Sequence, residues 1–262
     1  MSRRTKALIS GLLLVLTLVV NALGAFGFIN GRSQKDISDS YPTLITPAPS
    51  TFSIWSLIYI LLISSVIVMI VRANDEYYGN IIDEIAPLFW LSCIFNIIWI
   101  VLFSFDLIGL STLAIFGLLI VDILIVQRIG KLQTQRRFLF PVTFGLYSGW
   151  LFIATVANIT LWLVSINWNG FGINPEIWGV VILLVAVVLT WLVLTRIKNA
   201  IFPLPIAWAY FGIYKNLTSP GGFNNQYTLL PKIAIIGGIL LIAIAVFQLY
   251  RNKFCSMPIR NE

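Results

Sequence analysis

Long apolar runs separated by short polar segments dominate the chain. A helix needs about 20 predominantly apolar residues to cross a bilayer. The runs are continuous rather than alternating, which argues against a membrane β-barrel and predicts an all-α, polytopic bundle of transmembrane helices. We expect eight spans, at residues 7–28, 52–71, 86–105, 108–126, 139–164, 177–194, 200–214 and 233–249.

Two of these runs allow another interpretation. The run at 200–214 is short and contains two prolines, so a tilted or re-entrant segment is the alternative to a full span. The first run follows a basic N-terminus and has small residues at Ala22 and Gly24, a pattern typical of a cleaved signal peptide. Its apolar character continues to Phe28, which favours a retained helix. In the third run, Pro87 is expected in the first helical turn, where proline is tolerated.

Composition supports a membrane protein and narrows its chemistry. The chain is 59% hydrophobic and only 10% charged, whereas about a quarter of a soluble domain is charged. The net charge of +7 is explained by basic loops and gives no evidence for a nucleic-acid partner. The chain has no histidine, which removes histidine ligation of haem and histidine acid–base catalysis. The two cysteines have no motif spacing, so neither a metal site nor a disulfide framework is predicted.

The distribution of Lys and Arg predicts the orientation in a cell membrane. Cytoplasmic loops carry an excess of these residues. Eight spans with both termini in the cytoplasm leave four of the 17 basic residues outside, namely Arg32, Lys35, Lys215 and Lys232. The remaining basic residues are then cytoplasmic: Arg3, Arg4, Lys6, Arg72, Arg128, Lys131, Arg136, Arg137, Arg196, Lys198, Arg251, Lys253 and Arg260.

Charged residues near the fourth span carry two further expectations. A strongly basic loop is expected to contact anionic lipid through Arg128, Lys131, Arg136 and Arg137. Asp122 lies within the fourth span, where a carboxylate is a functional candidate by default. We favour the simpler interpretation that Asp122 reaches toward Arg128 or Arg72 at the membrane surface.

Aromatic and amide side chains recur at one depth of the predicted bundle. They are placed in pairs on single helix faces and fall within roughly 15 Å of the outer boundary. Each amide taken alone is explained by hydrogen bonding between helices. Their shared depth instead predicts one pocket for a flat hydrophobic ligand, which aromatic rings would stack on and amides would anchor. The predicted ligand-binding residues are Trp55, Tyr59, Asn96, Trp99, Asn158 and Trp162.

The first loop is expected to close this pocket. Proline fixes its own φ and disfavours helix at the preceding residue. Residues 42–49 should therefore form a stiff, non-helical segment at the mouth of the bundle. The predicted lid residues are Tyr41, Pro42, Pro47 and Pro49.

These residues resemble the motifs of the tryptophan-rich sensory protein (TspO/MBR) family, which includes the mitochondrial translocator protein. The family pattern around the second helix is Y-x-x-L-x-x-P followed by F-x-x-V-W-x-x-L-Y. Its third helix carries L-N-x-x-W-S-x-x-F-F, and its fifth carries a longer pattern with P, A, N and W. The matching residues here are Tyr41, Leu44, Pro47, Phe52, Trp55, Tyr59, Asn96, Trp99, Phe103, Pro141, Ala154, Asn158 and Trp162.

The resemblance covers residues 7–167 and implies a TspO-like five-helix unit at 1–167, with about three additional spans and a tail at 168–262. It implies a pocket between the first loop and helices two, three and five, with a tetrapyrrole such as porphyrin or haem, or a sterol-like lipid, as ligand. The chain departs from the family in lacking a tryptophan between the loop prolines and in having Ile100 where the family has serine. These departures from the family pattern affect which ligand the pocket would bind.

The leading functional hypothesis is a membrane receptor or sensor for such a ligand, with membrane lipid as its surroundings and no required cofactor. A small-molecule transporter is one alternative, although no inverted repeat is visible. Light-dependent porphyrin degradation at the pocket tryptophans is another. No nucleophile–base pair or nucleotide loop supports a conventional enzyme. Gly145 and Gly149 form a GxxxG pattern, which allows a close helix contact and a homodimer, although we favour a chance occurrence over a dimer face.

Overall fold

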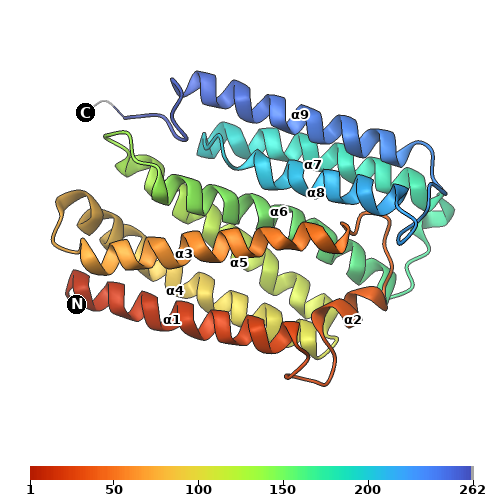
Figure 1. Ribbon diagram of the computed structural model, residues 1–262, viewed down its shortest axis with the longest axis horizontal. Helices are drawn as coiled ribbons and strands as arrows, with labels where there is room; N and C mark the ends of the chain where they lie inside the picture. Colours follow the sequence, from red (N-terminus) through yellow and green to blue (C-terminus); the bar gives the residue numbers. More distant parts are fainter. Residues whose placement is uncertain (261–262) are drawn as a thin grey trace.

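The computed structural model describes residues 1–260, and over that range the chain forms helices joined by short segments (Figure 1). Seven helices are long and apolar enough to cross a membrane, by length and composition. The long helices are α1 (Arg3–Ala25), α3 (Ile54–Val71, preceded by the 3-10 helix η1, Pro49–Ser53), α4 (Glu76–Ser104), α5 (Ile108–Leu132), α6 (Leu139–Ser165), α7 (Pro175–Ile197) and α9 (Leu230–Arg251). The shorter ones are α2 (Gln34–Asp39), η2 (Gly170–Gly172) and α8 (Pro203–Thr218). The prediction of an all-α polytopic membrane bundle is confirmed.

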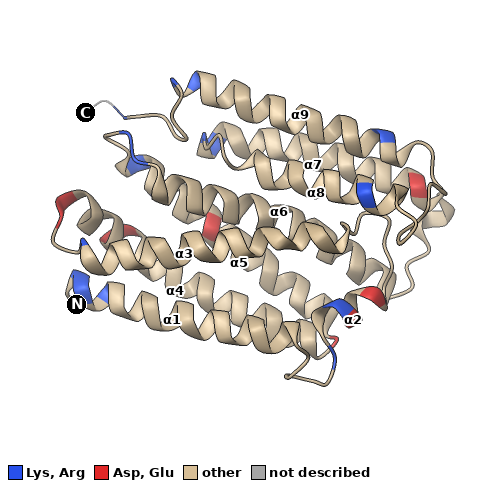
Figure 2. Cartoon of the chain, viewed as in Figure 1, with Lys and Arg blue, Asp and Glu red and all other residues tan. Residues whose placement is uncertain are grey.

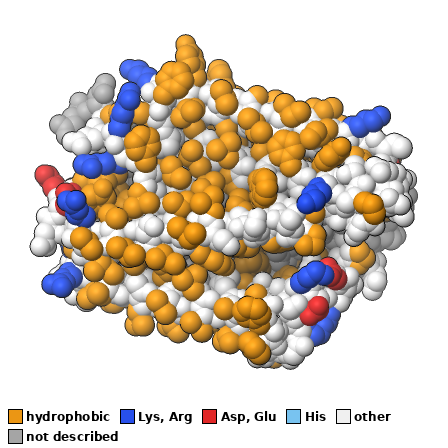
Figure 3. Space-filling model, viewed as in Figure 1, with side chains coloured by type: hydrophobic (Ala, Val, Ile, Leu, Met, Phe, Trp, Pro, Cys, Tyr) orange, Lys and Arg blue, Asp and Glu red, His pale blue; other side chains and the backbone are white. Residues whose placement is uncertain are grey.

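The helices run roughly side by side, and α6 lies between two groups of them. On one side of α6 are α1, α3, α4 and α5, and on the other are α7, α8 and α9 (Figure 1). Most charged residues lie at the two ends of the bundle (Figure 2). Apolar side chains cover the middle of the face drawn in Figure 3. This distribution suits a bundle whose middle is surrounded by hydrocarbon.

The helix α4 begins ten residues before the predicted span. Its N-cap is Asp75, whose carboxylate accepts a hydrogen bond from the backbone N–H of Tyr78 at 3.2 Å. Asp83 and Glu84 lie on this helix and are paired: Asp83 accepts from Arg3 and Lys6, both at 2.7 Å, and Glu84 accepts from Arg128 at 2.8 Å. The placement of Pro87 in a first turn is therefore wrong, because the helix extends beyond the apolar segment and the proline falls inside it.

The helix α8 runs alongside α9 and connects the two ends of the bundle, although it is only 16 residues long (Figure 1). At 1.5 Å per residue it spans about 24 Å, less than the roughly 30 Å hydrocarbon core. The non-helical segment before it is buried in protein, as irregular backbone at membrane depth must be. There the backbone N–H of Ala200 donates to Ser256 O at 2.8 Å, and the Asn199 amide donates to Pro141 O at 2.8 Å.

Candidate functional site

Trp55 lies at the centre of an aromatic cluster that joins α3, α4 and α6. Its ring is stacked on Tyr59 at 5.2 Å between centroids and on Trp99 at 6.3 Å. It meets Tyr147 and Trp150 edge to face at 6.2 and 6.1 Å. Such aromatic pairs stabilise by about 0.5–1.5 kcal/mol beyond their buried area. We call Trp55, Tyr59, Trp99, Tyr147 and Trp150 the aromatic cluster.

A chain of hydrogen bonds runs through the bundle beside this cluster. Tyr59 Oη donates to Asn21 Oδ1 at 2.9 Å, and Asn21 Nδ2 donates to Asn96 Oδ1 at 2.6 Å. Asn96 Nδ2 then donates to Tyr147 Oη at 3.1 Å. The chain links α1, α3, α4 and α6, so these polar groups are satisfied inside an apolar bundle.

Asn158 forms a second polar contact on the far side of Trp99. Its Oδ1 accepts from Trp99 Nε1 at 3.4 Å and from Ser111 Oγ at 3.5 Å. The side-chain amide of Asn158 donates to its own helix at Ala154 O, 3.1 Å away. Trp99 therefore connects the aromatic cluster to the α5–α6 interface.

Trp162 does not join the other five predicted residues. Its side chain is 40% exposed and covers Gly109 of α5, where an added Cβ would lie 2.8 Å from the indole nitrogen. Residues four apart on a helix are offset by about 40°, because 3.6 residues complete a turn. Relative to Asn158, this offset turns Trp162 to the edge of the α5–α6 interface, where it packs on Gly109 and is partly exposed. In this structure Trp162 therefore lies apart from the aromatic cluster, and its predicted contact with a ligand stays a prediction.

Sequence reasoning missed three residues of the site. Asn21 is an amide within an apolar run, like Asn96, so the same desolvation argument predicts an inward position. Tyr147 and Trp150 lie three residues apart on α6, and their spacing places them on one face. The Nε1 atom of Trp150 is buried and has no hydrogen-bond partner among residues 1–260. A buried donor without an acceptor is costly, and it gives the cluster a polar group available to a ligand.

The first loop is attached to the α4–α5 turn through Asp106. Tyr41 Oη donates to Asp106 Oδ2 at 3.2 Å, and Arg32 lies 3.6 Å from the same carboxylate. Partial burial, together with the bond to Asp106, raises the pKa of Tyr41. The short helix α2 begins with a capping box in which Ser33 and Asp36 bond each other, and these bonds lower the pKa of Asp36.

The other half of the first loop is attached to α8. The backbone N–H of Ala48 donates to Gly212 O at 2.9 Å, and Trp208 Nε1 donates to Thr51 O at 2.8 Å. Asn216 Nδ2 donates to Thr46 O at 3.0 Å. Residues 42–48 are non-helical, as predicted, and Pro49 begins η1. At the loop's edge, Phe52 of η1 lies edge-on to Trp150 at 5.8 Å.

A comparison with protein-family models matches residues 7–250 to the family described as TSPO-like protein. The chain belongs to the TSPO-like family. The resemblance inferred from the motifs is thereby confirmed, and the matched range continues beyond residue 167. Comparisons with curated proteins and with solved structures give no match.

In this TSPO-like chain a cavity of about 300 Å³ lies between the first loop and the start of α7, apart from the aromatic cluster. It is bounded by loop residues 42–45, the end of α6, the segment 168–173 and the start of α7. Trp168 and Trp178 line it, and Trp178 Nε1 is already bonded to Gly170 O at 2.8 Å. Pro42 is the one predicted lid residue on its wall. The six predicted pocket residues are not on its wall, and those of the cluster are packed against one another.

Asp122 does not reach the membrane surface. Its side chain is completely buried, and neither carboxyl oxygen has a hydrogen-bond partner among residues 1–260. Arg128 instead pairs with Glu84 at 2.8 Å. The interpretation that Asp122 reaches toward Arg128 or Arg72 is therefore wrong, because it lies on the face of α5 that is buried in the bundle.

Proposed function

We propose that this TSPO-like protein is a membrane receptor that binds a flat hydrophobic ligand, of porphyrin, haem or sterol-like type, at the aromatic cluster. Trp55 and Trp99 would stack on the ligand, while Asn96 and Asn158 hold the surrounding rings in place. The observation that carries the proposal is the unpartnered Trp150 N–H within a cluster of five aromatic rings. A flat ligand with a polar edge provides ring faces and an acceptor together.

The ligand would enter by displacing rings that now fill the site. Phe52 is exposed and Trp55 is partly exposed at the end of the cluster nearest the first loop. We therefore expect the path to pass between η1 and α6. Because the loop is bonded to α8 and to Asp106, ligand entry and loop position should be coupled.

Titration of the purified protein with protoporphyrin IX, followed by quenching of tryptophan fluorescence, tests this proposal. Trp55→Leu should weaken binding several-fold, because about 1 kcal/mol of ring stacking is lost beyond the buried area. Trp191→Leu is the matched control, since Trp191 stacks on Phe247 at 6.2 Å between α7 and α9. Trp162→Leu should also have little effect.

Trp178→Leu distinguishes the cluster from the cavity beside α7. If Trp178→Leu weakens binding and Trp55→Leu does not, the ligand occupies that cavity and the proposed placement is wrong. Equal weakening by Trp55→Leu and Trp191→Leu in folded protein would also contradict it. Porphyrin flux measured in proteoliposomes distinguishes a receptor from a transporter. A receptor should give no flux, whereas a transporter should move porphyrin across the membrane.

A further inference from the structure

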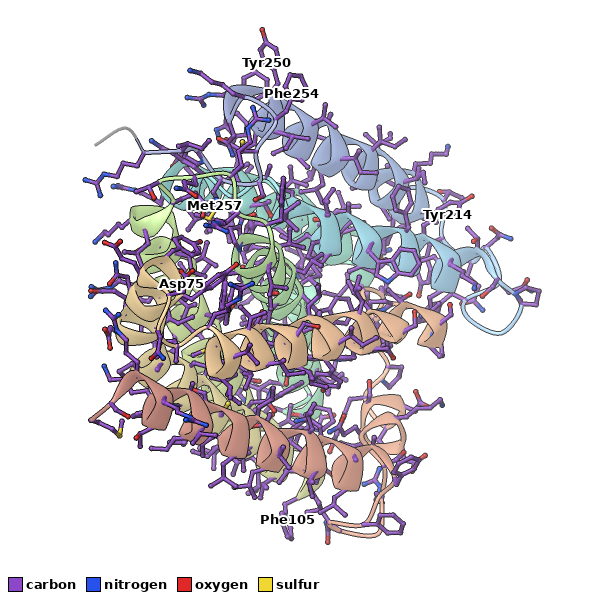
Figure 4. All side chains as sticks on the ribbon, turned by 60° about the vertical axis from the view of Figure 1, so that its left-hand side comes forward. Asp75, Phe105, Tyr214, Tyr250, Phe254 and Met257 are labelled. Atoms are coloured by element: carbon purple, nitrogen blue, oxygen red, sulfur yellow. The ribbon has the colours of Figure 1, made fainter. Side chains whose placement is uncertain are left out.

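A second cavity, of about 450 Å³, lies at the opposite end of the bundle from the aromatic cluster, where the N-terminus and the tail as far as Arg260 are found. Its walls come from the end of α5, the end of α7 and the C-terminal tail after α9. Met257 of this tail lies at the same end of the bundle as Asp75, and Tyr214 lies at the other (Figure 4). The TSPO-like site described above uses none of these residues.

The tail forms a fixed wall of this cavity. The backbone N–H of Arg260 donates to Gln133 O at 2.8 Å, and the Asn252 amide donates to Lys198 O at 2.8 Å. Buried Met257 packs so closely on α5 that a Cβ at Gly130 would lie 2.7 Å from its Cε. The cavity is therefore built by specific contacts between segments that are distant in the sequence.

The charge of the wall has one sign. Lys131, Arg196, Lys198 and Arg260 line the cavity, and no acidic residue of the described chain does. None of the four is in an ion pair among residues 1–260, whereas Arg3, Lys6 and Arg128 at the same end are paired with acidic residues. Four cations around one cavity create a positive potential that favours an anion.

Apolar side chains make up most of the rest of the wall, namely Ile197, Met257, Pro258 and Ile259, and Gln127 adds an uncharged polar side chain. Ile197, the last residue of α7, is buried, whereas Ile259 of the tail is exposed, so the apolar part of the wall reaches the protein surface at Ile259. Cations beside an apolar rim match a phosphate group with hydrocarbon attached. Basic pockets between transmembrane helices bind anionic lipid head groups in this way.

We propose that this cavity is a binding site for a phosphate monoester, supplied by the head group of an anionic lipid. The Arg side chains would bind phosphate oxygens in pairs, and the Lys side chains would add charge. The acyl chains would leave the cavity along Ile259, which is exposed at its edge. Because the wall includes the ends of α5 and α7 together with the tail, an occupied site would hold these three segments together.

The test measures the shift in the thermal unfolding midpoint of the full chain in uncharged detergent, since a ligand of the native state stabilises it. The probes are dihexanoyl phosphatidic acid, dihexanoyl phosphatidylcholine and inorganic phosphate. Phosphatidic acid should stabilise the protein and phosphatidylcholine should not. The variant Lys131→Gln/Arg196→Gln/Lys198→Gln should bind phosphatidic acid at least about tenfold more weakly.

The matched control is Arg4→Gln/Arg72→Gln/Arg136→Gln, which removes the same charge from exposed positions at the same end. It should bind as the native chain does. Competition by inorganic phosphate would support the phosphate group alone as the recognised part, and its absence would support the lipid. Equal loss in both triple variants, or no binding of phosphatidic acid, overturns the proposal. If the pocket variant does not fold, the exposed single change Lys131→Gln should still weaken binding.

Discussion

At the residue scale, the site depends on amides that satisfy one another. Asn21 and Asn96 meet at 2.6 Å with no water-exposed alternative, and each also holds a tyrosine hydroxyl. Their positions fix the rings of Tyr59 and Tyr147, which in turn pack on Trp55. The amides therefore support the shape of the aromatic cluster in addition to joining helices.

A double-mutant cycle on Asn21 and Asn96 tests this role. Asn96→Leu should lower the free energy of unfolding by about 1–3 kcal/mol, because Asn21 and Tyr147 lose their partner. In the Asn96→Leu variant, the further change Asn21→Leu should lower the free energy of unfolding by less than it does in the native chain. The difference, which is the coupling energy, should be about 0.6–1.7 kcal/mol. The measurement is denaturant unfolding in detergent.

The control cycle pairs Asn21→Leu with Asn158→Leu. Asn158 bonds Trp99 and Ser111 and shares no hydrogen bond with Asn21. Separate networks should give additive changes. Equal coupling in the two cycles would mean that the effects spread through general packing and not through the Asn21–Asn96 bond.

At the element scale, the first loop is held by α8, which lies beyond the predicted five-helix unit. The contact is close because Gly212 has no side chain. A Cβ at Gly212 would lie 2.1 Å from Thr51 Oγ1 and 2.7 Å from Thr51 Cγ2. The close contact between the loop and α8 therefore requires glycine at position 212, because any side chain there would force the loop to shift.

Gly212→Ala should displace η1 and weaken the Ala48–Gly212 hydrogen bond. Overpacking of this kind costs about 1–3 kcal/mol, which thermal unfolding in detergent would measure. Gly221→Ala is the control, since no atom lies within 4 Å of a Cβ placed there. Thr51→Gly in the Gly212→Ala background should restore much of the loss. An unchanged midpoint for Gly212→Ala would show that the loop is not held at this point.

The sequence predicted the long helices well because apolar length alone defines a membrane span. It placed the start of α4 too late because charged residues were assigned to a loop. Those residues continue the helix, with Asp83 paired to α1. The helix α2 was missed because its signal is one capping box, Ser33 with Asp36, in a polar segment without periodicity. Helix spacing did not predict that Trp162 packs on Gly109 and outside the aromatic cluster, because spacing defines a helix face but not the residues that cover it.

At the scale of the whole molecule, α6 and α8 bring the two predicted parts of the chain together. Gly145 lies against the Asn199 side chain, and a Cβ at Gly149 would lie 2.1 Å from Phe202 O. The GxxxG pattern thus serves a close contact within the chain, so it gives no support for a homodimer. The match of the family model across residues 7–250 includes both parts.

The number of crossings depends on whether α8 crosses the membrane, and so does the side on which we expect the C-terminal tail. The N-terminus and the tail as far as Arg260 lie at the same end of the bundle, as an even number of passes would place them (Figure 1). Seven helices meet the length expected of a span, so the prediction of eight spans requires α8 to supply the eighth pass with only 16 residues. Because α8 is shorter than the hydrocarbon core, the non-helical segment before it and the C-terminal tail, which are joined by the Ala200–Ser256 hydrogen bond, would make up the rest of the pass. The same arrangement gathers the 13 basic residues predicted to be cytoplasmic at one end, as the positive-inside rule requires.

Reporter fusions that are active only outside the cytoplasm test this topology in cells. A fusion after residue 262 should be silent, and one after Lys198 should be silent as well. A fusion after Gly221, between α8 and α9, should be active because α8 has then crossed to the outer face. If α8 were re-entrant, the fusion after Gly221 would be silent and the fusion after residue 262 active. The fusion after Lys198 is the control, since both topologies place it inside.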